Sequence, residues 1–82
     1  MNKQPFTFEM AKALVAGGVE NLTDSDLGSC WKAYAEKASY HFADDSAQEW
    51  EQAYGCKRVV EQLDAEHIRR GYPRPDRREY LL

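Results

Sequence analysis

The chain has 82 residues, a net charge of −3 and a hydrophobic fraction of 43%, which suffices for one domain with one core and argues against disorder. No apolar run is long enough to cross a membrane, and no signal-peptide pattern follows the first residues, so we expect a cytoplasmic protein. The two cysteines are expected to be reduced rather than bridged.

The first predicted helix spans residues 8–16. Thr7 precedes it as an N-cap, and Gly17 and Gly18 follow it with the left-handed backbone freedom that a helix end favours. Its apolar residues are spaced to form one face, which predicts packing against the rest of the domain.

The second predicted helix begins after Thr23 and ends near residue 41 or 42. Asp24 suits the positive end of the helix dipole, and Leu22 and Leu27 have the spacing of a hydrophobic staple. Apolar and aromatic residues then recur in alternating steps of four and three, which predicts a seam against another helix. This seam consists of Leu27, Trp31, Tyr34, Ala38 and His41.

The third predicted helix begins after Ser46, which forms a capping box with Glu49, and stops at Gly71. Arg69 and Arg70 suit the negative end of its dipole. Its seam consists of Ala53, Cys56, Val60, Leu63 and His67, with Trp50, Val59 and Ile68 alongside.

The loop between the second and third helices is very short, so the two should lie antiparallel as neighbours. We therefore predict an all-α, three-helix fold in which a short N-terminal helix packs on a long antiparallel hairpin. Residues 1–71 form the helical domain, and residues 72–82 form an extended, Arg/Tyr-rich C-terminal tail. A turn near residue 43 would place Trp31 opposite Gly55 and Cys30 opposite Cys56.

The third helix is longer than the second, and its overhang leaves apolar side chains that the first helix or a second copy of the chain must cover. A homodimer is one expectation from this pattern. The residues assigned to this dimer or core seam are Trp31, Trp50, Leu63, His67 and Ile68.

No pattern in the chain predicts catalysis or a cofactor. His41, Asp44 and Asp45 lie close together in the sequence, but they are one ligand short of a convincing metal site. His41 and His67 would lie at opposite ends of a helical hairpin, so they could not share one site with a nucleophile. We therefore expect no enzyme, no metal and no cofactor.

Charge is divided unevenly along the chain. Residues 1–55 carry a balance of −5 and residues 56–82 a balance of +2, with five arginines between residues 67 and 78. Arginine and tyrosine concentrate binding energy at protein interfaces. The predicted partner-binding residues are Arg69, Arg70, Tyr72, Arg74, Arg77, Arg78 and Tyr80.

Two functions are compatible with this pattern. The first is a protein-interaction module, similar in size and charge to the small acidic helical inhibitors of phages and mobile elements, an analogy of character rather than of family. The alternative is a nucleic-acid-associated protein whose arginines contact phosphate while Tyr72 or Tyr80 stacks on a base. A further alternative is that residues 80–82 fold back onto the helices and serve only the core.

Overall fold

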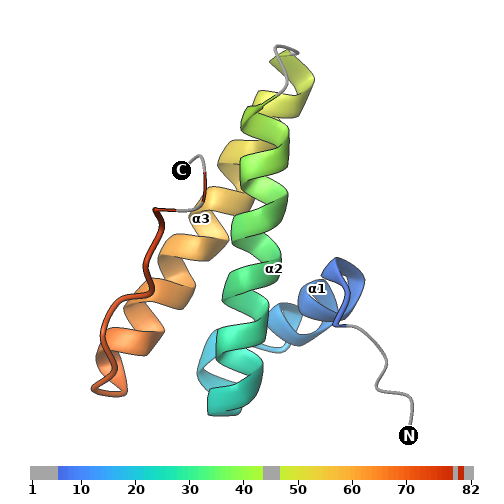
Figure 1. Cartoon of the computed structure of the whole chain (residues 1–82). Coiled ribbons are helices and arrows are strands. Elements are labelled where there is room, and N and C mark those ends of the chain that lie inside the picture. Colours follow the sequence, from blue (N-terminus) through green and yellow to red (C-terminus); the bar gives the residue numbers. More distant parts are fainter. Residues whose placement is uncertain (1–5, 44–46, 79, 81–82) are drawn as a thin grey trace, which may run out of the picture.

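The computed structural model describes residues 6–43, 47–78 and 80. All the regular structure in this part of the chain is helical: α1 (Phe8–Ala16), the short 3-10 helix η1 (Val19–Asn21), α2 (Asp24–Phe42) and α3 (Ala47–Arg69). α2 and α3 lie antiparallel and side by side, and α1 packs against α2 (Figure 1). The predicted three-helix fold is therefore confirmed.

The first two helices begin where their capping residues predict. The Thr7 hydroxyl accepts a hydrogen bond from the Met10 amide at 3.2 Å. The Thr23 hydroxyl accepts one from the Asp26 amide at 3.1 Å. Each bond satisfies an amide that has no partner within its own helix. The predicted capping box of Ser46 and Glu49 lies outside the residues and side chains that the structure describes.

The end of α3 also follows its sequence signal. Gly71 has a φ of +86°, and its amide donates to the Ile68 carbonyl at 3.0 Å. The Tyr72 amide donates to the His67 carbonyl at 2.9 Å, which completes a Schellman motif. At the end of α1 the left-handed residue is Gly18, with a φ of +100°, whereas Gly17 stays right-handed.

One core joins the three helices and η1. Phe8 of α1 packs its ring edge-on against Tyr34 of α2, with the ring centroids 4.9 Å apart. Ala11 of α1 is buried in this core, and Leu14 and Val15 of the same helix pack against it. The buried members of this core are Ala11, Leu22, Leu27, Cys30, Trp31, Tyr34, Ala35, Val60 and Leu63.

The predicted packing of Trp31 against Gly55 is wrong. A β-carbon added at Gly55 would meet nothing within 4 Å, so Gly55 makes no room for Trp31. Trp31 instead donates from its indole Nε1 to Asp64 Oδ1 at 2.7 Å, further along α3. The prediction assumed that the axes of α2 and α3 stay parallel from the turn onward, whereas α3 is inclined to α2 (Figure 1). An added side chain at Gly55 would therefore gain helix propensity without overpacking.

Candidate partner-binding surfaces

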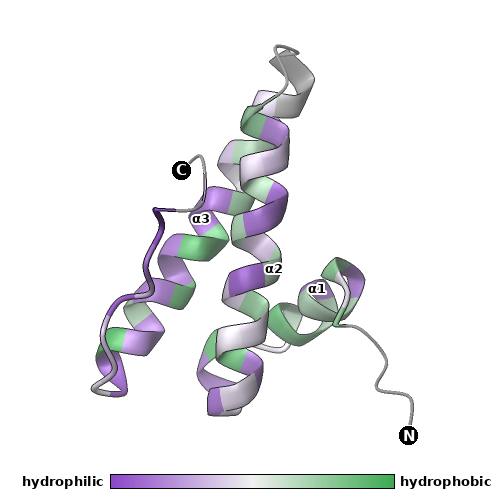
Figure 2. Cartoon of the chain, viewed as in Figure 1, coloured by the Kyte–Doolittle hydropathy of each residue, from purple (hydrophilic) through white to green (hydrophobic). Residues whose placement is uncertain are grey.

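The C-terminal segment returns along α3 after Gly71 (Figure 1). Its ribbon is mostly hydrophilic (Figure 2), yet it is anchored at its far end by aromatic packing. Tyr80 packs edge-on against Trp31, with ring centroids 5.6 Å apart. Arg77 forms an ion pair with Asp64, so polar contacts also fix this segment to α3.

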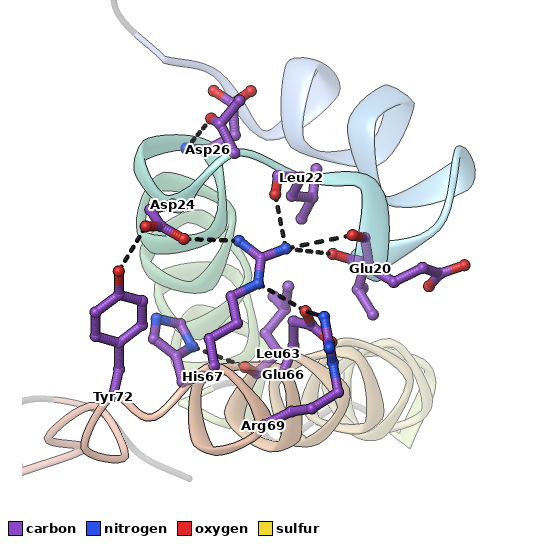
Figure 3. A network of polar contacts seen from close by, with 12 residues as sticks. Glu20, Leu22, Asp24, Asp26, Leu63, Glu66, His67, Arg69 and Tyr72 are labelled. Carbon is purple, nitrogen blue, oxygen red and sulfur yellow. Dashed lines mark hydrogen bonds and ion pairs between the residues drawn. The ribbon is translucent and has the colours of Figure 1, made fainter.

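Arg70 joins the end of α3 to the start of α2 through a polar network. Figure 3 shows this network with its partners Glu66, Asp24 and Leu22 labelled. The Nε of Arg70 donates to Glu66 at 2.6 Å, and its Nη1 donates to Asp24 at 2.9 Å. Its Nη2 donates to the Leu22 carbonyl at 2.6 Å, just beyond η1. The side chain is only 14% exposed. This arginine therefore connects segments of its own chain.

The carboxylates of this network are held in their charged form. Hydrogen bonds from Arg69 and then from Arg70 lower the pKa of Glu66 to about 2. A hydrogen bond from the Tyr72 hydroxyl, at 2.5 Å, and then one from Arg70 lower the pKa of Asp24. The same contact with Asp24 raises the pKa of Tyr72. Each cation and donor in the network thus already has an internal anion.

Asp64 is a second centre that binds arginines. Its side chain is 7% exposed, and it accepts from Trp31 on one oxygen and from Arg77 on the other. Arg74 approaches the same oxygen to 3.4 Å. A buried carboxylate is tolerated when it is charge-paired and hydrogen-bonded, and both conditions hold here.

Every arginine between residues 69 and 78 is therefore ion-paired within the chain. Arg69 binds Glu66, and Arg78, which is 90% exposed, binds Asp76. Arg70 and Arg77 are largely covered, whereas Arg69, Arg74 and Arg78 reach solvent. The arginines are thus paired at Glu66, Asp64 and Asp76, and Arg74 and Arg77 share the single carboxylate of Asp64. Their role in binding a partner stays a prediction.

The residues assigned to a dimer or core seam differ in how far they are buried. Trp31 and Leu63 are buried in the core, so the chain itself covers them. His67 is half-buried and donates from Nδ1 to the Leu63 carbonyl at 2.7 Å. Trp50 and Ile68 are exposed. The homodimer stays a prediction.

Sequence reasoning missed a groove on α2. It has a volume of about 650 Å³ and lies between the start of α1, with Phe6 just before it, and one face of α2. Its α2 residues recur at helical spacing, so they share a face that looks like ordinary solvated surface in the sequence. The α2 groove is lined by Phe6, Phe8, Ser29, Lys32, Ala33, Glu36, Lys37 and Tyr40.

Three lysines gather at this groove. Lys37 Nζ lies 5.4 Å from the centroid of the Phe8 ring and 5.9 Å from that of Tyr40. Lys12 Nζ lies 5.9 Å from the Phe8 ring, although it also pairs with Glu9 at 3.8 Å. Lys32 and Lys37 form no ion pair with any residue that the structure describes. The sequence did offer one signal for this groove, because all three lysines lie within residues 1–55, where acidic residues outnumber basic ones.

The two cysteines are unbridged. Burial raises the pKa of both the Cys30 and the Cys56 thiol, which disfavours the reactive thiolate. The predicted position of Cys30 opposite Cys56 stays a prediction. Among the described residues, no group of three His, Cys, Asp or Glu side chains could hold a metal ion, and Asp44 and Asp45 lie outside them.

Within the same described residues, no helix is both long and apolar enough to span a membrane. Comparisons of the chain with protein-family models, curated proteins and solved structures gave no match. The functional argument therefore depends on the surfaces described above.

Proposed function

We propose that this chain is a non-enzymatic protein-interaction module that occupies a surface of a partner protein complex. The observation that carries the proposal is the set of large apolar side chains left in solvent, led by Tyr40 at 70% and Ile68 at 59% exposed. Tyrosine and tryptophan are the residue types that most often concentrate binding energy at interfaces. The exposed set is Met10, Tyr40, Trp50, Tyr54, Ile68 and Tyr72.

The role of the module would be inhibitory, as for the small acidic helical proteins of phages and mobile elements. This part of the proposal is supported by the small size and the acidic charge of the chain. A small helical body with exposed aromatic side chains suits the blocking of a surface on a larger complex.

Nucleic-acid binding is the second candidate, and the internal ion pairs disfavour it. A phosphate would have to compete with Glu66 for Arg69 and Arg70, and with Asp64 for Arg77. Counterion release supplies most of the affinity for nucleic acid, and it requires cations that are free to neutralise phosphate. A net charge of −3 adds general repulsion.

The test is capture of a partner by the tagged full-length chain from a lysate of its native cells, with and without nuclease. We expect a stoichiometric protein partner that nuclease does not release. The double variant Tyr40→Ala/Ile68→Ala should weaken capture, and Gln52→Ala/Gln62→Ala is the matched control on exposed helix positions. Retention that nuclease abolishes, or capture of no protein at all, would overturn the proposal.

A further inference from the structure

We propose that the α2 groove binds an acidic peptide segment of the partner that also carries a large apolar side chain. This inference rests on the proposed function and names the surface and the partner chemistry that serve it. The groove supports this inference better than the C-terminal arginines do, because Lys32 and Lys37 form no ion pair with any residue that the structure describes.

The shape of the groove suits one large side chain and a short stretch of backbone. Its volume of about 650 Å³ lies within the range of roughly 300–1,000 Å³ that is usual for ligand pockets. Phe6, Phe8, Ala33 and Tyr40 provide apolar lining. A segment with no apolar side chain would leave this lining exposed to water, so the partner must bring one.

The charge of the groove selects an acidic segment. Lys32 and Lys37 line it, and Lys12 lies beside it over the Phe8 ring. Although the chain as a whole is acidic, charges are screened beyond about 8 Å at physiological ionic strength. A carboxylate entering the groove would therefore respond mainly to these nearby ammonium groups. Uniformly basic segments would meet like charge and be rejected.

The ring contacts of Lys37 hold its ammonium group at the groove. Its Nζ lies within 6 Å of both the Phe8 and the Tyr40 centroids, which is the range of cation–π attraction. Glu36 also lines the groove, so a continuous run of acids would meet repulsion at that point. Acidic residues separated by an apolar anchor match this arrangement best.

The experiment uses short synthetic peptides in which Glu residues flank a single Trp, and matched peptides with Lys in place of Glu. Binding to the full-length chain is measured by fluorescence anisotropy, and the site is mapped from NMR shifts of the Phe8, Ala33 and Lys37 amides. Vesicles of phosphatidylcholine with phosphatidylserine serve as the anionic membrane probe.

The acidic peptides should bind and shift these amides, whereas the basic peptides should not. Because like charges across an interface are strongly unfavourable, Lys32→Glu/Lys37→Glu should weaken binding by at least about tenfold. The matched reversal on α3, Lys57→Glu/Arg58→Glu, should change affinity less than about twofold since it lies outside the groove. If the reversal variant does not fold, Lys32→Gln/Lys37→Gln should still weaken binding.

Absence of acidic-peptide binding, equal loss in both reversal variants, or tighter binding to the anionic vesicles would overturn the groove assignment. Partner capture from lysate separates this result from the proposed function. A partner captured equally by wild type and by Lys32→Glu/Lys37→Glu would overturn the groove and leave the module standing. Capture of no partner by wild type would overturn the module itself.

Discussion

Two cationic regions of this molecule differ in what their charges do. The C-terminal region carries five arginines, and each is paired with a carboxylate of the same chain. The α2 groove has fewer cations, yet Lys32 and Lys37 have no ion-pair partner in the described part of the chain. The region with more cations is thus the one whose cations are already ion-paired within the chain.

The difference follows from the side chains and from their surroundings. The guanidinium of Arg70 presents several donors in one plane, so it can join Glu66, Asp24 and backbone carbonyls together. Lys37 has a compact ammonium that lies over aromatic rings instead. A count of charges in a sequence therefore does not give the charge that a partner meets.

The largest expected effect on stability comes from removing the buried carboxylate of Asp64, which binds the C-terminal segment. Asp64→Ala should lower the free energy of unfolding by about 2–4 kcal/mol, because it leaves Arg77 and the Trp31 indole without their acceptor. Urea denaturation measures this loss. As a control, Asp76→Ala removes a solvent-exposed pair with Arg78 and should have a much smaller effect. Equal effects of the two variants would contradict internal anchoring at Asp64.

The next largest effect is the difference in melting temperature between variants of two adjacent arginines. Arg70→Ala should lower the melting temperature more than Arg69→Ala, although each removes one positive charge. Arg70 is 14% exposed and reaches α2 and the Leu22 carbonyl, whereas Arg69 is 63% exposed and contacts Glu66 within α3. Thermal unfolding followed by circular dichroism gives the order, and the reverse order would show that Arg70 is not a cross-link.

Acid should weaken the C-terminal region through Glu66. Its pKa is about 2 in the folded chain against an ordinary value of 4.5, so its stabilising contribution is complete above about pH 4.5. It is lost as the pH falls from about 4.5 toward 2, because the unfolded chain takes up the proton first. Urea midpoints measured across this window should fall for wild type and fall less for Glu66→Gln. Parallel curves would exclude the pairing.

The smallest expected effect on stability comes from the lysines of the α2 groove. Lys32→Gln/Lys37→Gln should change the free energy of unfolding by less than about 1 kcal/mol, because neither lysine forms an ion pair within the described residues. The loss of the Lys37 ring contacts would account for any small decrease. A larger loss in urea denaturation would mean that these lysines serve the fold, as Arg70 does.

The positions at which the helices begin and end could be predicted from local residues. Thr7, Thr23 and Gly71 act on backbone groups within a few positions of themselves, so their effect can be predicted from neighbouring residues alone. The periodic spacing of apolar residues likewise identified the buried face of α2, including Trp31, since helical geometry fixes which residues share a face.

Which distant charges form pairs depends instead on the tertiary structure. Arg70 meets Asp24, and Arg77 meets Asp64, because α3 is inclined to α2 and the C-terminal segment returns along it. Because of the same inclination, Trp31 contacts Asp64 and does not pack against Gly55. Ion pairs between distant residues depend on the register and the angle between whole helices. Small differences in packing set this register and angle, so no local sequence pattern predicts them.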